Sequence, residues 1–130
     1  MTGDGESAII IIMRNTVKQL EFDFVDREDF EAFLQSLPVK DRAKLEAVII
    51  NTESFGMAVA IKMKWVKKIE TDLYELRSKQ GNDIQRALYF HKINNEYVIT
   101  HGFTKKGEKT PENEKAKERK LRDHYKETVR

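Results

Sequence analysis

The first clear pattern along the chain is an alternation of apolar and polar residues. Over residues 17–25, the apolar side chains of Leu20, Phe22 and Phe24 alternate with the acidic side chains of Glu21 and Asp23. Successive side chains of a strand point to opposite faces, so this alternation predicts a half-buried strand. The apolar run over residues 9–13 is interpreted as a further strand.

The spacing then becomes helical. Asp26 is the expected N-cap, with Asp29 three residues later in a variant of the capping box, so we predict a helix over residues 27–37. Pro38 ends this helix and starts the next one, because proline lacks a backbone N–H and fits only the first helical turn. Apolar residues at three- and four-residue intervals predict a second helix over residues 39–55, which the following glycine ends.

The second half of the chain begins with a short helical turn, expected over residues 57–65, and then reads as strands. The strands are predicted over residues 66–79, 82–92 and 95–103, with turn-forming pairs at Gly81 and Asn82 and at Asn94 and Asn95. Pro111 then opens a charged helix that extends to about Tyr125. The thin apolar stripe expected on this helix consists of Ala116, Leu121 and Tyr125.

The predicted order of elements is strand, two helices, three-stranded meander and helix. We therefore expect an α+β fold with a small antiparallel or mixed sheet, the N-terminal helices packed on one face, and a charged C-terminal helix. Residues 1–7 are interpreted as a flexible N-terminus and residues 8–130 as a single domain. A chain of this length buries about two thirds of its unfolded surface on folding, which is enough for one core.

Composition excludes several kinds of chemistry. The chain has no cysteine, so it has no disulfide framework and no thiolate ligand or nucleophile. The three histidines lack metal-ligand spacing, and no glycine-rich phosphate loop occurs, so we expect no metal site and no cofactor. The longest apolar run, residues 8–13, is too short to cross a bilayer and lacks signal-peptide features. We expect a cytoplasmic protein without membrane contact.

Charge is distributed unevenly, although the net charge is only +2. Residues 1–60 hold 6 Lys and Arg against 11 Asp and Glu, a balance of −5, whereas residues 61–130 hold 18 against 11, a balance of +7. The C-terminal half is therefore the part of the chain that is suited to a polyanion.

Basic residues recur at fixed places within the strand-like runs of this half. The motifs are Trp65-Val66-Lys67-Lys68-Ile69, Leu73-Tyr74-Glu75-Leu76-Arg77, Gln85-Arg86-Ala87-Leu88-Tyr89-Phe90, His101-Gly102-Phe103-Thr104-Lys105-Lys106, and Lys109-Thr110-Pro111 with Glu114. In this order and spacing the sequence resembles the RelE/HigB-type toxins of bacterial type II toxin–antitoxin systems, in particular their phage-associated branch. The resemblance covers roughly residues 17–125 and implies a RelE-like fold.

The resemblance implies a ribosome-dependent mRNA endoribonuclease that inhibits translation. In that reaction the ribose 2′-hydroxyl attacks its own 3′-phosphate, and related toxins use clusters of Arg and Lys where other nucleases use a histidine pair. Arg holds phosphate bidentately and Lys acts as a mobile point charge, so such a cluster needs no metal. The implied partners are the ribosome with its mRNA and a HigA-like helix-turn-helix antitoxin, through which alone operator DNA would be bound.

Nine residues become site candidates on this basis. The catalytic candidates are Arg77, Arg86, Lys105, Lys106 and His101, and the RNA-binding candidates are Lys67, Lys68, Tyr89 and Lys109. Structural explanations stay open beside these roles. Arg77 can pair with Glu75 on the same strand face, and Arg86, which shares its face with apolar residues, is either partnered or exposed in a cleft.

Two other functions also stay open. The family often has an aromatic residue where this chain has Gln85 and an apolar one where it has Lys115, and no general base is evident. These departures favour a non-catalytic module that binds an antitoxin or RNA. A gyrase-inhibiting toxin of the ParE type on the same fold is a third hypothesis, which Lys105 and Lys106 fit less well.

Overall fold

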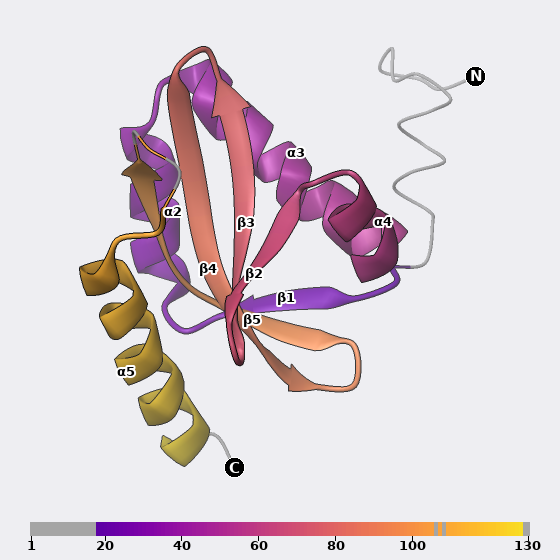
Figure 1. Cartoon of the computed structure of the whole chain (residues 1–130), viewed down its shortest axis with the longest axis vertical. Coiled ribbons are helices and arrows are strands. Elements are labelled where there is room, and N and C mark those ends of the chain that lie inside the picture. Colours follow the sequence, from indigo (N-terminus) through magenta and orange to yellow (C-terminus); the bar gives the residue numbers. More distant parts are fainter. Residues whose placement is uncertain (1–17, 106, 108, 129–130) are drawn as a thin grey trace.

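The computed structural model describes residues 18–105, 107 and 109–128, whose arrangement is shown in Figure 1. The elements are β1 (Glu21–Phe24), α2 (Arg27–Ser36), α3 (Val39–Phe55), α4 (Met57–Lys62), β2 (Val66–Glu70), β3 (Leu73–Gln80), β4 (Asp83–Ile93), β5 (Glu96–Lys105) and α5 (Glu112–Thr128). The strand predicted over residues 9–13 and the flexible N-terminus predicted over residues 1–7 lie outside the described residues.

The five strands form one mixed sheet in the order β1-β5-β4-β3-β2. The three hairpin-connected pairs are antiparallel, and β1 lies parallel to β5 at one edge. The parallel pair needs a long connection, which α2, α3, α4 and the remaining strands supply. The predicted α+β class with a mixed sheet is confirmed.

Helices cover the two faces of the sheet unequally. Tyr89 belongs to the main hydrophobic core, which it shares with Phe30 of α2 and Leu45 of α3. The next residue, Phe90, points to the opposite face and contacts Tyr125 of α5 with ring centroids 5.6 Å apart. The N-terminal helices therefore pack on one face, as predicted, and α5 packs on the other.

Local sequence explains how the N-terminal helices begin and where they pack. The Asp26 carboxylate accepts a hydrogen bond of 3.0 Å from the Asp29 backbone N–H, which confirms the predicted N-cap of α2. On β5, a Cβ added to Gly102 would lie 2.4 Å from the ring of Phe33 in α2. Because that distance is too short for any side chain, glycine at this position lets α2 sit directly on the sheet.

The predicted strand over residues 66–79 is wrong, because the chain reverses within it. The turn between β2 and β3 lies at Thr71 and Asp72, and Asp72 has a φ of 55°. Aspartate is one of the few residues other than glycine that enters the left-handed region readily. A Thr-Asp pair without glycine or proline is a weak turn signal, so the pattern hid this hairpin.

The predicted apolar stripe of α5 is only partly correct. Leu121 and Tyr125 are half-buried, but Ala116 is exposed, and the residue that α5 buries completely is Glu118. Ion pairs orient the helix in this way: Arg119 Nη2 lies 2.7 Å from a Glu70 carboxylate oxygen, and Lys126 Nζ lies 2.5 Å from Asp72 Oδ2. Charged contacts with the β2–β3 turn thus decide which side of α5 faces the sheet.

Candidate functional site

Basic side chains from three strands converge on the face of the sheet that α5 partly covers. Arg77 of β3 lies directly opposite Arg86 of β4, and Arg86 lies opposite Phe103 of β5. Because every second residue of a strand shares a face, His101 and Lys105 point to the same side as Phe103. The structure therefore brings four of the five predicted catalytic residues to one face.

Glu75 occupies the centre of this group. Its carboxylate is fully buried and accepts a hydrogen bond from Arg86 Nη1 on one oxygen. Arg77 Nε lies 3.5 Å from the same oxygen, and the Thr110 hydroxyl donates a 2.8 Å hydrogen bond to the other. The pairing of Arg77 with Glu75 considered from the sequence is confirmed, and Arg77 keeps 29% of its side chain exposed.

Arg86 is completely enclosed, in contrast to Arg77. Its exposed fraction is 0%, and Nη2 donates a 3.1 Å hydrogen bond to the backbone oxygen of Gly107 beyond the end of β5. A buried guanidinium needs a counter-charge and several acceptors, and Glu75 and Gly107 supply both. Of the two environments considered from the sequence, Arg86 has the partnered one.

Two lysines complete the group. Lys67 of edge strand β2 is opposite Glu75, so it lies on the same face, with its side chain exposed. Lys105 Nζ is buried and has no hydrogen-bond partner among the described residues. Burial lowers the pKa of the Lys105 ammonium, and the Arg86 charge lowers this pKa further, whereas Glu75 acts in the opposite direction. Lys105 therefore holds its proton less firmly than an exposed lysine does.

We call Lys67, Glu75, Arg77, Arg86 and Lys105 the basic cluster. Four cations surround a single carboxylate. A hollow of about 260 Å³, which Arg77 lines, opens beside it at the ends of β3 and β4. The excess of positive charge makes an anion the natural ligand, and the exposed Arg77 and Lys67 are the side chains that can reach it first.

His101 lies on the same face but under α5. Only 2% of it is exposed, and Nε2 donates a 3.0 Å hydrogen bond to Glu114 Oε1, while the Thr100 hydroxyl lies 3.1 Å from Nδ1. Burial lowers the pKa of His101 below its usual range, although the hydrogen bond with Glu114 opposes this shift. The contact between His101 and Glu114 joins β5 to α5 and holds the helix against the sheet.

The remaining candidates lie elsewhere. Lys106 is outside the described residues, and Lys109 is exposed on the connection between β5 and α5. Lys68 and Tyr89 point to the opposite face of the sheet, where both line a pocket with other aromatic residues. Sequence reasoning identified Glu75 only as a partner of Arg77, although its spacing of two residues from Arg77 already placed both on one strand face.

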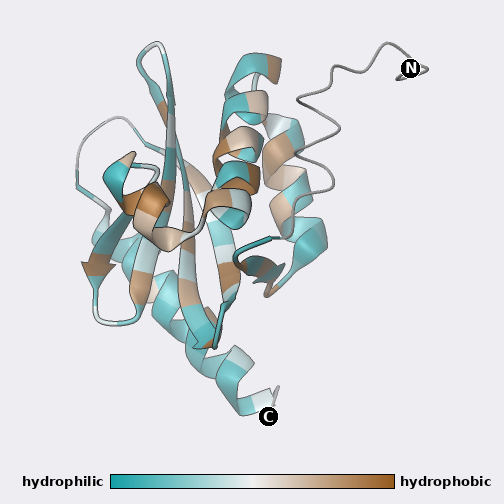
Figure 2. Cartoon of the chain, turned by 90° about the vertical axis from the view of Figure 1, so that its right-hand side faces the viewer, coloured by the Kyte–Doolittle hydropathy of each residue, from teal (hydrophilic) through white to brown (hydrophobic). Residues whose placement is uncertain are grey.

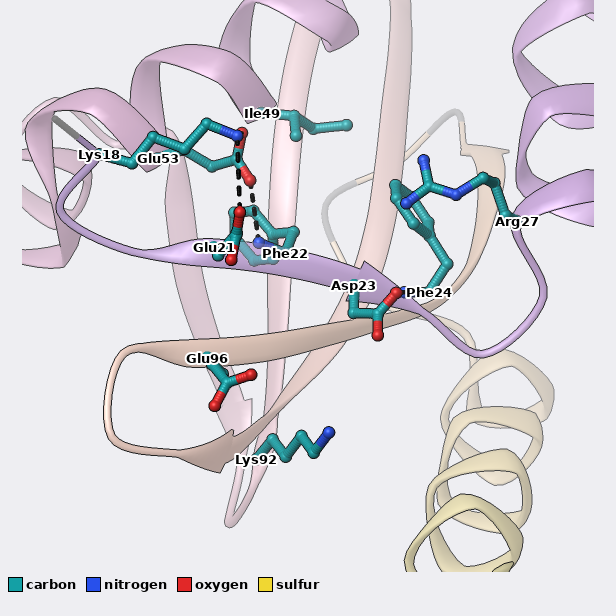
Figure 3. Close-up of a pocket in the computed structure, with 10 residues that line it drawn as sticks. All are labelled: Lys18, Glu21, Phe22, Asp23, Phe24, Arg27, Ile49, Glu53, Lys92 and Glu96. Carbon is teal, nitrogen blue, oxygen red and sulfur yellow. Dashed lines mark hydrogen bonds and ion pairs between the residues drawn. The ribbon is translucent and has the colours of Figure 1, made fainter. Parts of the chain in front are cut away.

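A larger cavity, of about 450 Å³, lies far from the basic cluster in the sheet. Figure 3 shows that β1 supplies much of its lining, with side chains from α2, α3, β4 and β5 around it. Glu53 accepts a 2.9 Å hydrogen bond there from the backbone N–H of Phe22, so this carboxylate satisfies the open edge of β1. Acidic and basic side chains are mixed in this cavity, which gives it no clear preference for an anion.

Within the described part of the chain, no group of three or more His, Cys, Asp or Glu side chains is placed to hold a metal ion. Over the same residues, no helix is both long and apolar enough to cross a membrane.

Comparison with known proteins adds a family to this geometry. Residues 32–123, more than two thirds of the chain, match the family model of the Gp49-like phage-derived proteins (DUF891). The matched range includes every residue of the basic cluster. No curated protein matches the sequence significantly. The chain therefore belongs to the Gp49-like family of phage-derived proteins, a toxin–antitoxin-related family within the RelE/ParE-like toxin superfamily.

Proposed function

We propose that the protein is a metal-independent endoribonuclease toxin that cuts mRNA on the ribosome. The observation that carries this proposal is the basic cluster, in which four cations and one carboxylate share a sheet face. Cleavage by the 2′-hydroxyl builds negative charge on the phosphorane, and preorganised cations stabilise such charge without a metal. Membership of a toxin family supports the same conclusion.

The side chains of the cluster have three different roles in the proposed reaction. Arg77 and Lys67 are exposed and bind the scissile phosphate. Lys105, whose pKa burial lowers, exchanges a proton with the reacting oxygens. Arg86 is enclosed, so it acts through Glu75, which it holds in place beside Arg77.

The proposed partners follow from the same assignment. A toxin that arrests translation must be held inactive, and the partner we propose is a small helix-turn-helix antitoxin of the HigA-like kind, which alone would contact operator DNA. The ribosome presents the mRNA, and the protein acts in the cytoplasm.

Mapping of mRNA 5′ ends on ribosomes after induced expression tests this function. Arg77→Ala is the informative variant, because Arg86→Ala would leave Glu75 without its buried counter-charge and endanger the fold. Arg42 offers a matched control: its side chain is 27% exposed, against 29% for Arg77, and it pairs with Glu46 on α3. We expect new cuts within codons for the natural chain and for Arg42→Ala, and none for Arg77→Ala. Cuts that persist in Arg77→Ala would contradict the proposal.

A non-catalytic binding module is the second candidate, and the burial of Arg86 favours it. A guanidinium with no exposed surface cannot touch a phosphate in this conformation. Growth arrest without mRNA cuts, together with retained binding of RNA or antitoxin, would support this module, and inhibition of gyrase in a supercoiling assay would support a ParE-type toxin.

A further inference from the structure

We propose that an aromatic pocket binds a nucleobase together with its attached phosphate. The pocket lies on the face of the sheet that the N-terminal helices cover. The pocket has a volume of about 370 Å³ and is lined chiefly by three tyrosines with His91, Met57 and Lys68. Small-ligand sites in proteins typically measure roughly 300–1,000 Å³. We call the group formed by Tyr74, Tyr89, Tyr97 and Lys68 the tyrosine pocket.

The tyrosine rings provide a surface suited to a flat heterocycle. Tyr89 is buried at the base of the pocket, and Tyr74 stacks against it with ring centroids 5.4 Å apart and an interplanar angle of 23°. Tyr97 meets Tyr89 edge-on, with centroids 5.8 Å apart, and His91 lies against Tyr97. Tyr74 and Tyr97 are only half-buried, so their rings remain accessible. Stacking on aromatic side chains of this kind is how proteins bind unpaired bases.

The charge at the pocket decides between two ligands that favour aromatic surroundings. Aromatic rings also attract organic cations. The pocket, however, has Lys68 in its lining and no acidic residue there. The Lys68 ammonium repels a cationic ligand and attracts the phosphate of a nucleotide, so the combination fits a nucleotide.

The position of the pocket connects it with the basic cluster. Lys67 and Lys68 are consecutive residues of β2, one of the two edge strands, and they point to opposite faces of the sheet. A single strand of RNA that crosses this edge would meet Lys67 on the cluster side and Lys68 on the pocket side. That the bound base belongs to the cleaved RNA strand rests on the proposed function. That the pocket binds a nucleotide does not.

Helix α4 supplies part of the lining of the pocket, through Met57 and Ile61. Ile61 lines the pocket and is 63% exposed. Figure 2 views the molecule from the side on which α4 lies in Figure 1 and shows hydrophobic positions on this short helix. Because Ile61 is exposed, it can be changed without disturbing the core, which makes it a suitable place for a test.

Fluorine NMR of the full chain labelled with fluorotyrosine tests the pocket directly. The chain has four tyrosines, of which three line the pocket and Tyr125 lies on α5, so Tyr125 is an internal control. We expect adenosine monophosphate at millimolar concentration to shift the signals of Tyr74, Tyr89 and Tyr97 and to leave Tyr125 unchanged. Tetramethylammonium is expected to shift none of them. No shift with the nucleotide, or shifts with the cation instead, would overturn the proposal.

Matched variants locate the binding and separate it from cleavage. Ile61→Glu and Lys68→Ala should each weaken the nucleotide roughly two- to five-fold, as for one exposed charge contact. Their controls, Ile50→Glu and Lys40→Ala on α3, should leave its affinity unchanged. Equal effects of test and control variants would contradict the assignment. Arg77→Ala should abolish mRNA cuts but keep the nucleotide-induced shifts, so either proposal can fail without the other.

Discussion

Glu75 has no exposed surface, and both of its carboxylate oxygens are used by neighbouring side chains. Arg86 and Thr110 donate hydrogen bonds to it, and Arg77 adds an ion pair. The single acid therefore fixes two arginines and the chain beyond β5 at the same time. Loss of this acid would remove the carboxylate that the buried guanidinium of Arg86 contacts.

The first prediction concerns this counter-charge. Glu75→Gln should lower the free energy of unfolding by about 3–5 kcal/mol, because it removes the buried carboxylate that Arg86 and Arg77 both contact. Denaturant titration followed by circular dichroism measures the change. Glu46→Gln is the control, since Glu46 is 48% exposed where it pairs with Arg42 and such pairs contribute about 0–1 kcal/mol. A loss below about 1 kcal/mol for Glu75→Gln would show that Arg86 does not depend on Glu75.

The sequence was sufficient to predict part of this site, but not the burial of Arg86. The alternation of strand residues placed Glu75 and Arg77 on one face, and that placement is correct. The enclosure of Arg86 was not predictable, because it depends on Gly107 and Thr110 from a distant part of the chain folding over it. Contacts between residues that are far apart in the chain produce no periodic pattern in the sequence.

A second prediction concerns the contact between Gly102 and Phe33. Gly102→Ala should destabilise the protein by about 1–3 kcal/mol, since the added methyl group would lie 2.4 Å from the Phe33 ring. Phe33→Leu removes the ring and costs stability by itself, but the double variant should lose less than the sum of the two. Thermal unfolding of the four proteins in this cycle measures the coupling. Additive losses would mean that α2 shifts as a whole instead.

At the scale of elements, α5 packs through charged residues more than through apolar ones. Arg119 and Lys126 of α5 pair with Glu70 and Asp72 at the β2–β3 turn, and Glu118 of the same helix is fully buried. The carboxylate oxygens of Glu118 accept no hydrogen bond from the described residues, although Arg122 Nη1 lies 3.5 Å from one of them. Burial raises the pKa of Glu118 to about 7 from its ordinary 4.5.

This raised pKa gives the third prediction, a pH dependence of stability. The folded protein binds the Glu118 proton more tightly than the unfolded chain does, so Glu118 lowers the stability progressively as pH rises from about 4.5 to about 7. Glu118→Gln stays neutral and should therefore be more stable than the natural chain by roughly 3–4 kcal/mol at pH 8, at about 1.4 kcal/mol per pKa unit. The difference should shrink toward pH 4.

Denaturant titrations of both proteins at several pH values measure this difference. Glu127→Gln on the exposed side of α5 is the control and should show no comparable gain. A gain that is equal at pH 4 and pH 8 would attribute the effect to packing and exclude the titration of Glu118.

The elements themselves were predictable where a local signal sets them. The cap at Asp26 and the glycine at the end of α3 mark helix boundaries through their own backbone chemistry, and the structure has both. The β2–β3 reversal at Asp72 was missed because its local turn signal is weak. The burial of Glu118 was missed because tertiary contacts, the ion pairs of α5 with Glu70 and Asp72, decide it. Local rules describe where an element starts, while the partner across the sheet decides which side it buries.

At the scale of the whole molecule, charge and architecture divide the chain in the same way. The acidic first half forms β1 and the helices of one face, and the basic second half forms the other four strands and α5. Four cations of the basic half gather at the cluster. A polyanion that approaches the molecule is therefore attracted most strongly to the face that carries the basic cluster.

The last prediction uses this asymmetry and rests on the proposed RNA binding. The affinity for a single-stranded RNA should fall linearly with the logarithm of salt concentration, and each phosphate contact should contribute about 0.7 to the slope. Lys67→Ala removes one exposed cation from the cluster and should reduce the slope by about that amount. Lys40→Ala, an equally exposed lysine on α3 at the opposite face, should leave the slope unchanged. Fluorescence anisotropy at several salt concentrations measures both variants, and equal slopes for Lys67→Ala and the natural chain would place the RNA elsewhere on the molecule.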